Sequence, residues 1–363
     1  MIYRGSTRGC QTSRAAARGE ASRPEGAGRD AVDTPGGRRL PSVRFPVADS
    51  FLPALVEAPL SRMSIVDRTL SATLPLVPRA LVRRFSARYI AGESQEQALA
   101  VVAALNRQGA MATLDVLGED LKDRQEAEAT RLVYERMLDA IAAQQLAANV
   151  SVKLTALGLK IDPALALEHM TRLCAHAKAH GSFVRIDMED SSCTEATLAL
   201  HDRLRQDADN VGVAIQAYLR RSVDDVDRLV ERRANVRLCK GIYIESRKIA
   251  YRDRDIVRRN FAFLLERLLK GGCYVGIATH DEILTWEGMR LIRELRLAPD
   301  RYEFQMLLGV DEALRRILIA GGHRLRVYVP FGERWYEYSL RRLKENPQMA
   351  GYVLKNILHP AGA

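Results

Sequence analysis

The stretch 149-NVSVKLTALGLKIDPALALEHMTRLCAHAKAHGSFVRIDME-189 contains two short β-rich runs separated by one segment with helical periodicity. The runs at 149–157 and 183–189 are dominated by β-branched and other apolar residues, with few breakers. Between them, 164–180 repeats its apolar residues at the spacing of one helix face. A helix that joins two strands in this way is typical of a parallel sheet, in which crossovers connect neighbouring strands. This stretch therefore predicts one βαβ unit.

The same alternation continues along the chain and predicts a (β/α)8 barrel. Eight strand–helix units within one domain match the count and size of that fold. A doubly wound nucleotide-binding sheet is disfavoured, because no GxGxxG follows the first strand. We expect a disordered leader at 1–48, an N-terminal helical arm at 49–108 and the barrel at 109–360. The expected strands lie at 110–118, 149–157, 183–189, 211–218, 235–243, 273–280, 302–309 and 324–330.

Composition excludes several classes of protein. The chain has 363 residues, of which 47% are hydrophobic, so it can bury a sizeable core. No apolar run reaches the about 18 to 20 residues of a membrane-spanning helix. The five cysteines are scattered without a CxxC pair, which favours a reducing compartment and predicts neither a disulfide framework nor a zinc site. Much of the net charge of +10 comes from arginines in the leader, whose low apolar content predicts disorder.

Polar residues accumulate late in the expected strands, where a barrel of this type carries its reaction site. Charges inside strands that are covered on both faces must be paired or bound to a ligand. A purely structural ion network among Lys153, Asp187, Arg185 and Arg237 is the alternative explanation. We expect no metal, because neither HExxH nor a group of histidines and carboxylates at ligand spacing is evident. The strand-end residues are Asp115, Glu119, Lys153, Arg185, Asp187, Gln216, Tyr218, Arg237, Lys240, Tyr243, Thr279, His280, Gln305 and Tyr328.

The C-terminal stretch 338-YSLRRLKE-345 places Tyr338, Arg341, Arg342 and Glu345 on one face of a helix. Paired guanidiniums bind a carboxylate or phosphate in a bidentate manner. Taken alone, the pattern also fits a solvated charged face. Combined with the strand-end charges, it favours an organic anion and a phosphate-bearing cofactor.

The strings LDVLGE, SVKLTALG, RIDMED, VAIQAY, VRLCKGIY, ATHDE, YEFQMLLGV, RVYVPFG and YSLRRLKE resemble the successive motifs of proline dehydrogenases, in their short bacterial monofunctional form. The resemblance covers about residues 85 to 358. It implies FAD bound non-covalently on a (βα)8 barrel, with the last helix placed over the barrel mouth. It also implies oxidation of L-proline to Δ1-pyrroline-5-carboxylate, by hydride transfer from C5 to flavin N5. One departure is Ile242, where relatives usually carry alanine.

The resemblance assigns the substrate site residue by residue. Arg341, Arg342 and Lys153 would hold the proline carboxylate, and Asp187 would orient Lys153. Glu119 would pair with Arg341 as a gate. Tyr328 would pack near the proline ring and favour proline over 4-hydroxyproline. Leu307 would add an apolar wall, and Tyr338 belongs to the final-helix motif.

The resemblance likewise assigns the cofactor site. The residues that would contact FAD are Gln216, Arg237, Lys240, Tyr243, Thr279, His280 and Glu345. A guanidinium near the flavin can stabilise its reduced anionic form. Reoxidation would use a membrane quinone, and a separate pyrroline-5-carboxylate dehydrogenase would receive the product, since we expect no fused second domain. The expected location is cytoplasmic, with peripheral contact at the inner face of the membrane left open.

Three alternatives remain at this point. A Schiff-base aldolase would use Lys153 or Lys240 as a nucleophile. A nucleic-acid or acidic-membrane binder would use the basic leader, although the partner set that we expect contains no nucleic acid. A folate-reducing flavoenzyme would need a reduced nicotinamide donor.

Overall fold

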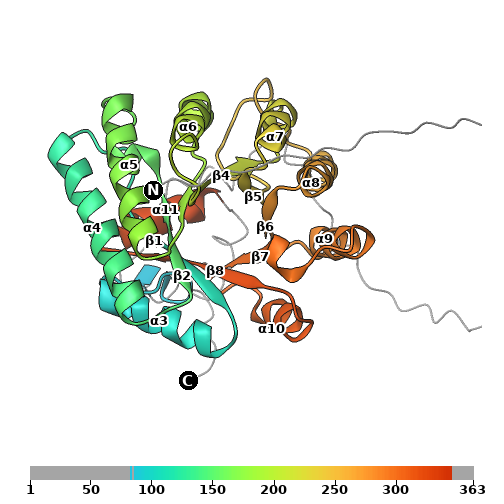
Figure 1. Cartoon of the computed structure of the whole chain (residues 1–363), viewed down its shortest axis with the longest axis horizontal. Coiled ribbons are helices and arrows are strands. Elements are labelled where there is room, and N and C mark those ends of the chain that lie inside the picture. The colour runs from blue at the N-terminus through green and yellow to red at the C-terminus, as the bar shows by residue number, and fades with distance from the viewer. Residues whose placement is uncertain (1–81, 84–85, 346–363) are drawn as a thin grey trace, which may run out of the picture. The chain divides into compact units, whose positions relative to one another are not determined.

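A closed ring of eight parallel strands forms the centre of the molecule (Figure 1). The computed structural model describes residues 82–83 and 86–345, without the side chains of 341–345. The expected leader, most of the expected helical arm and residues 346–360 lie outside the described residues. The barrel predicted from the alternation is confirmed. Its strands are β1 Met111–Val116, β2 Ala148–Val152, β3 Val184–Ile186, β4 Val211–Gln216, β5 Asn235–Cys239, β6 Tyr274–Ala278, β7 Tyr302–Leu307 and β8 Leu325–Phe331.

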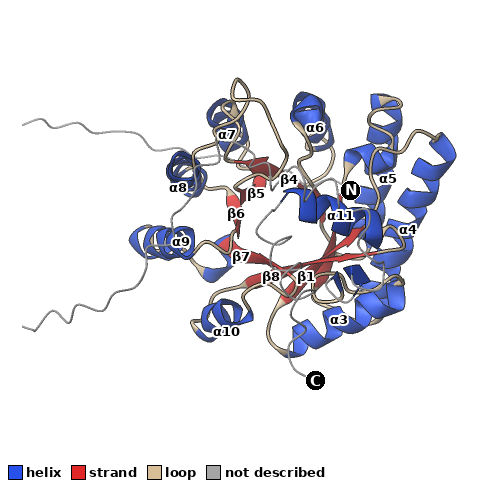
Figure 2. Ribbon diagram, turned by 180° about the vertical axis from the view of Figure 1, so that it is seen from behind, coloured by secondary structure: helices blue, strands red, loops and turns tan. Residues whose placement is uncertain are grey.

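Each strand pairs with its sequence neighbour, and β8 closes the ring by pairing with β1 through the register Met111↔Arg326 to Val116↔Phe331. A shell of helices surrounds the ring (Figure 2). The helices are α3 Gln95–Arg107, α4 Arg124–Ala143, α5 Pro163–Ala179, α6 Ser191–Leu204, α7 Ser222–Glu231, α8 Arg254–Lys270, α9 Glu282–Glu294, α10 Glu312–Ala320 and α11 Trp335–Glu345.

The strand β2 shows how alternation along a strand builds two different layers. Val150 and Val152 are fully buried in the hydrophobic core between strands and helices. Ser151 belongs to the other face and hydrogen-bonds to Asp187 on β3's C-terminal side. Because side chains alternate across a strand, the apolar set packs outward against helices and the polar set points into the barrel. The barrel lumen is therefore polar at this level.

Several strands end earlier than the β-rich runs suggested. β2 stops at Val152, and Leu154–Leu157 forms a 3-10 turn (η2) with Lys153 as its N-cap residue. Gly158 ends this turn in the left-handed region, at φ 99°. An apolar run such as KLTAL satisfies a buried turn as well as a strand, so periodicity alone could not locate the boundary. Lys153 consequently lies at the barrel mouth, just past the strand.

The helix α11 lies across the ring of strands in both views, whereas the other helices of the barrel surround it (Figures 1 and 2). Ser339 of α11 accepts a buried 2.6 Å hydrogen bond from Ser86. The guanidinium of Arg83 lies 5.9 Å from the Trp335 ring. These contacts tie the start of the described chain to the last described helix. Within the part of the chain that the structure describes, no helix combines the length and apolarity needed to cross a membrane.

Candidate active site

Lys153 forms the centre of a buried ionic group at the barrel mouth. Its Nζ donates to both carboxylate oxygens of Asp115, at 2.7 and 2.8 Å, and lies 4.0 Å from Asp187 Oδ2. Asp115 is fully buried in β1, and Lys153 is 5% exposed. Asp187 thus lies beside Lys153 as expected, yet the direct hydrogen bonds go to Asp115. The sequence marked Asp115 only as a strand-end residue and gave it no role.

Asp187 connects this pair to the rest of the mouth. Its Oδ1 accepts hydrogen bonds from Ser151 Oγ, at 2.7 Å, and from Arg237 Nη1. Its Oδ2 accepts a 2.7 Å hydrogen bond from the hydroxyl of Tyr328. Residues from β2, β5 and β8 therefore converge on one carboxylate. This convergence explains why charged residues can lie inside strands that are otherwise apolar.

Arg237 crosses the lumen from β5. Its Nε donates a 2.6 Å hydrogen bond to Gln305 Oε1, and its Nη1 also donates to Ser151 at 2.9 Å. The guanidinium carbon lies 5.2 Å from the centre of the Tyr328 ring. Its Nη2 is buried and has no hydrogen-bond partner within the described portion of the chain. A buried charged donor requires an acceptor, which a water or a ligand atom can supply at this position.

The pKa values of the group reflect the competition between burial and pairing. Burial raises the pKa of Asp115, although Lys153 opposes the shift. Burial also acts to raise the pKa of Asp187, but the charges of Arg237 and Lys153 outweigh it and lower that pKa. For Lys153, burial acts to lower the pKa, and the charges of Asp115 and Asp187 outweigh it and raise it. Lys153 is therefore a protonated cation, which suits anion binding and disfavours a Schiff-base nucleophile.

A separate polar layer lies below this one, and it changes the interpretation of Arg185. Arg185 Nη1 donates to the backbone oxygens of Asn235, at 2.7 Å, and Val213, at 3.2 Å. None of its hydrogen bonds among the described residues goes to Lys153 or Asp187, so Arg185 bonds within this lower layer and not within the hydrogen-bonded group at the mouth. A Cβ on Gly212 would lie 2.6 Å from Arg185 Nη1 and 2.4 Å from Asn235 O. Glycine at this position therefore makes the room that Arg185 occupies.

On the opposite side of the mouth, Lys240 follows β5 and pairs with Asp281. The distance from Lys240 Nζ to Asp281 Oδ2 is 3.0 Å, and Arg258 Nε reaches the same oxygen at 2.8 Å. Asp281 was not identified from the sequence, although it lies within the ATHDE string. Its backbone N–H donates to Thr279 Oγ1 at 3.0 Å. One shared carboxylate after β6 thus holds two cations, Lys240 at the end of β5 and Arg258 of α8.

His280 follows β6, and its Nε2 accepts a 2.9 Å hydrogen bond from the backbone N–H of Leu307. An accepting Nε2 must be unprotonated. Burial lowers the pKa of His280 to about 4, in agreement with a neutral ring. Leu307 itself ends β7 with 40% of its surface exposed. An exposed leucine at the mouth is suited to contact an apolar part of a ligand.

Gln216, the last residue of β4, is buried and donates a 2.9 Å hydrogen bond from Nε2 to the backbone oxygen of Glu189. Glu189 is a further buried acid that the sequence analysis did not assign. Its carboxylate accepts from the backbone N–H of Thr155 at 3.1 Å and from the Thr155 hydroxyl. Burial raises the pKa of Glu189. The amide of Gln216 is thereby held in a fixed orientation at the strand end.

The remaining predicted residues lie around the rim. Glu119, in the loop after β1, and Tyr243, in the loop after β5, are half-buried. The phenol of Tyr338 lies close enough to Lys153 and Tyr328 to raise the pKa of each, as a secondary influence beside burial and the nearby carboxylates. α11 therefore presents Tyr338 to the mouth. Arg341, Arg342 and Glu345 lie in α11, but their side chains are outside the described residues.

The structure also corrects one statement from the sequence. Asp139, His176 and His180 bring one carboxylate and two imidazoles together, so a group of histidines and a carboxylate at ligand distance does exist. The signal was the spacing of the two histidines, four residues apart on the helix that contains 164–180. The carboxylate partner is distant in sequence, so it could not be recognised without the packing of α4 on α5.

Comparisons with known proteins show to which family and fold the chain is similar. The family model described as "Proline dehydrogenase" matches residues 98–354. A relative named "Proline dehydrogenase 1", from Bacillus subtilis subsp. natto, is 38% identical over 287 residues, which cover 79% of this chain and 95% of the relative. A "Proline dehydrogenase" from Deinococcus radiodurans is 37% identical over 278 residues, 75% of this chain and 89% of the relative.

Longer proteins share the barrel as one part of their length. The "Bifunctional protein PutA" of Escherichia coli is 26% identical over 327 residues, which cover 77% of this chain and 25% of that protein. Among solved structures, proline utilization A from Bdellovibrio bacteriovorus, inactivated by N-propargylglycine, matches with a TM-score of 0.67 and 26% identity. This match covers 75% of the present chain and 34% of that one.

Proposed function

The chain belongs to the proline dehydrogenase family, and on this premise we propose that it oxidises L-proline to Δ1-pyrroline-5-carboxylate with FAD as its cofactor. The observation that carries the proposal is the group of buried Lys153, Asp187 and Arg237 with half-buried Tyr328 at the barrel mouth, and Tyr338 of α11 facing it. Such a group combines fixed charge, a ring-sized apolar surface and an unpaired donor. These are the features needed to position a small imino acid beside a cofactor.

The residues at the mouth fit FAD. The buried Nη2 of Arg237 offers a donor that no described side chain accepts. Gly241 has φ +104°, and a Cβ there would lie 2.1 Å from the Tyr218 ring, so the loop that carries Lys240 and Tyr243 requires glycine for its close approach. We propose that FAD contacts Gln216, Arg237, Lys240, Tyr243, Thr279, His280 and Glu345. When bound, FAD supplies a two-electron acceptor that takes a hydride from C5 of proline at flavin N5.

The carboxylate of proline needs more positive charge than the group around Lys153 provides. Lys153 and Arg237 are balanced there by Asp115 and Asp187. Within this group of four residues two cations face two anions, so the group has no net charge of its own. Arg341 and Arg342 follow Tyr338 by three and four residues, so helical spacing places all three on one face of α11. We therefore propose that these arginines supply the net charge that holds the carboxylate, with Lys153 as the converging cation.

The other rim residues have positioning roles in this proposal. Glu119 would pair with Arg341 and close the substrate cavity. Tyr328 would pack against the proline ring, held in place by its hydrogen bond to Asp187. Leu307, the register partner of Tyr328 on the neighbouring strand β7, would complete the apolar wall. When the proline ring is held in one orientation, C5 is aligned with its acceptor. Part of the binding energy is used to achieve this alignment.

We also propose how the reduced cofactor is reoxidised and what consumes the product. A quinone of the membrane would reoxidise the enzyme, and a separate pyrroline-5-carboxylate dehydrogenase would consume the product. Because quinones partition into the bilayer, the proposal places the protein in the cytoplasm with peripheral contact at the inner face of the membrane. Sedimentation with phospholipid vesicles, before and after reduction by proline, tests this contact. If the protein is absent from the vesicle pellet both before and after reduction, peripheral membrane contact is ruled out.

The central experiment is the visible spectrum of the purified protein before and after L-proline, without oxygen. The expected result is a flavin spectrum that bleaches with proline and recovers when a soluble quinone is added. A protein that stays colourless after reconstitution with FAD, or a flavin that proline does not bleach, would overturn the proposal. Trapping of a keto acid on Lys153 by borohydride would instead select the aldolase alternative, which the protonated state of Lys153 disfavours.

A further inference from the structure

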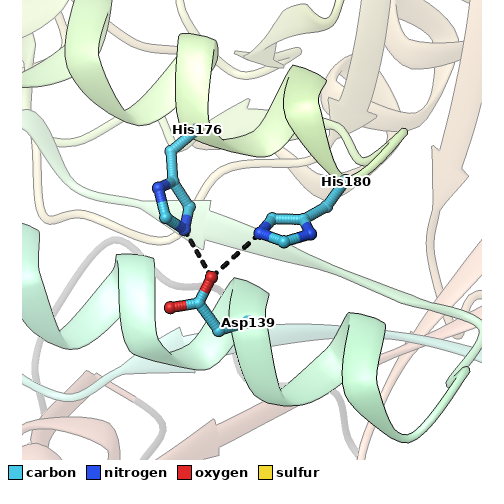
Figure 3. A group of neighbouring side chains, drawn as sticks. All are labelled: Asp139, His176 and His180. Atoms are coloured by element: carbon cyan, nitrogen blue, oxygen red, sulfur yellow. Dashed lines mark hydrogen bonds and ion pairs between the residues drawn. The ribbon is translucent and has the colours of Figure 1, made fainter.

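Asp139, His176 and His180 gather on the outer surface of the barrel (Figure 3). Asp139 belongs to α4, His176 lies in the last turn of α5, and His180 is the C-cap residue of α5. The two histidines are four residues apart, so they lie one turn above each other on the same helix face. Because α4 packs beside α5, the carboxylate of Asp139 lies opposite both rings.

The geometry of the three side chains is convergent. His176 Nε2 lies 2.7 Å and His180 Nε2 lies 2.9 Å from the same oxygen, Asp139 Oδ1. The ring centres are 5.1 Å apart and tilted by 59°. One ligand atom from each residue lies within 4.8 Å of the other two. In each imidazole, Nε2 is therefore the nitrogen directed toward Asp139 Oδ1.

We propose that Asp139, His176 and His180 form a binding site for a divalent transition-metal ion, with Zn²⁺ as the ion that fits best. Two imidazole nitrogens and one carboxylate oxygen are a ligand set that zinc accepts, at about 2.0 to 2.2 Å from each atom. Tetrahedral coordination separates ligand atoms by about 3.3 Å. The Asp139–histidine distances of 2.7 and 2.9 Å would have to open by about 0.4 to 0.6 Å, and the carboxylate would have to move aside so that the ion can take the point toward which both Nε2 atoms are directed. Zinc would keep a fourth, solvent-facing position for water.

Exposure permits both entry of the ion and this adjustment. The side chain of Asp139 is 53% exposed, and those of His176 and His180 are 31% exposed. A nearby histidine on α5 lacks this freedom. His169 is buried, with Nδ1 3.0 Å from Leu157 O and Nε2 3.1 Å from Glu128. Only the pair near the end of α5 combines two accessible rings with one carboxylate, within the described residues.

The location predicts a structural role for the metal. The C-terminal ends of the outer helices lie at the end of the barrel where the strands begin, opposite the mouth. An ion held by α4 and α5 would link two neighbouring helices of the folded state and would bind the unfolded chain far less well. Stability should therefore rise with metal concentration. The inference does not depend on the proposed function, because no residue of the mouth takes part.

The test uses the full chain without a polyhistidine tag, titrated with Zn²⁺ against a chromophoric chelator. We expect one zinc ion per chain at this site. H176Q and H180Q should each weaken binding at least tenfold, and the double variant should abolish it. Glutamine can still donate a hydrogen bond to Asp139, so loss of binding would report on the metal ligand and not on loss of the helix contact. The matched control is D209N, which removes an exposed carboxylate that pairs with Lys178 near the same end of α5.

A second measurement separates this site from others. Zn²⁺ should raise the Tm of the wild type and of D209N, and should leave the Tm of the double variant unchanged. Flavin reduction by proline in H176Q/H180Q should equal that of the wild type. Wild-type affinity and stoichiometry in the double variant would overturn the proposal, since the ion would then be bound elsewhere. Failure of the wild type to bind zinc would overturn it equally.

Discussion

The hydroxyl of Tyr328 donates a 2.7 Å hydrogen bond to Asp187 Oδ2, while Arg237, which donates to Oδ1 of the same carboxylate, lies over the Tyr328 ring. The tyrosine is thus held at its hydroxyl and at its ring face. Both contacts restrict rotation of the side chain, so the ring has a defined position at the mouth. A rigid aromatic wall can discriminate between rings that differ by one substituent.

Replacing Tyr328 with serine should shift specificity toward 4-hydroxyproline. The smaller side chain would open room for an additional hydroxyl, and the kcat/KM ratio of 4-hydroxyproline to proline should rise by roughly tenfold. Y328F is the matched control, because it keeps the ring but removes the hydrogen bond to Asp187. Its ratio should stay near that of the wild type. If serine and phenylalanine give the same ratio, ring size does not select the substrate.

Replacing Lys153 with methionine should destabilise the protein as well as weaken proline binding. The substitution leaves Asp115, which is fully buried, without the cation that donates to both its oxygens. Removing one partner of a buried pair costs about 3 to 5 kcal/mol. Urea unfolding of the wild type and K153M measures this difference.

The double variant K153M/D115N separates the two effects. Neutralising Asp115 removes the unpaired buried charge, so much of the lost stability should return. The KM for proline should stay high, because the cation that converges on the carboxylate is still absent. Recovery of proline binding together with stability would show that Lys153 acts only on the fold.

Much of the barrel was predictable, because each strand–helix unit repeats the same local pattern. Periodicity located β2 but not its end, since KLTAL satisfies a buried turn and a strand equally well. The strand-end rule indicated Lys153 and Asp187, but it could not separate the mouth from the layer below, where Arg185 bonds to Asn235. That distinction depends on the register between strands, which single-strand patterns do not contain. The pairings made by Asp115, Asp139 and Asp281 were not predicted for a related reason, because each lies far along the chain from the side chains that it contacts.

Replacing Arg341 with methionine should raise the KM for proline. A hydrogen bond to a charged group contributes about 1.5 to 3 kcal/mol, which corresponds to an increase of roughly ten- to 150-fold. R334M provides a control just before α11, because Arg334 forms an exposed ion pair with Glu126 at 3.7 Å. Its KM should change little, since surface pairs contribute weakly. Equal KM values in R341M and the wild type would exclude Arg341 from carboxylate binding.

Replacing Glu303 with glutamine should flatten the dependence of stability on acid pH. Glu303 is buried in the layer below the mouth and accepts a 2.8 Å hydrogen bond from Arg326 Nε. Burial acts to raise its pKa, but the charge and hydrogen bonds of Arg326 outweigh it and lower the pKa from 4.5 to about 2. A lowered carboxyl pKa stabilises the fold above the unfolded pKa, and this contribution is lost as pH falls from 4.5 through about 2.

The shift in the Glu303 pKa corresponds to about 3 kcal/mol at neutral pH, as an order of magnitude. E303Q should therefore be less stable than the wild type at pH 7, with Arg326 left unpaired, and the difference should narrow as pH falls below 4.5. Urea unfolding at a series of pH values measures the two curves. E294Q is the control, because Glu294 is 56% exposed in its pair with Arg290. Its replacement should change neither the free energy of unfolding at pH 7 nor the dependence of that free energy on pH appreciably. Parallel curves for E303Q and the wild type would mean that another carboxyl group controls acid unfolding.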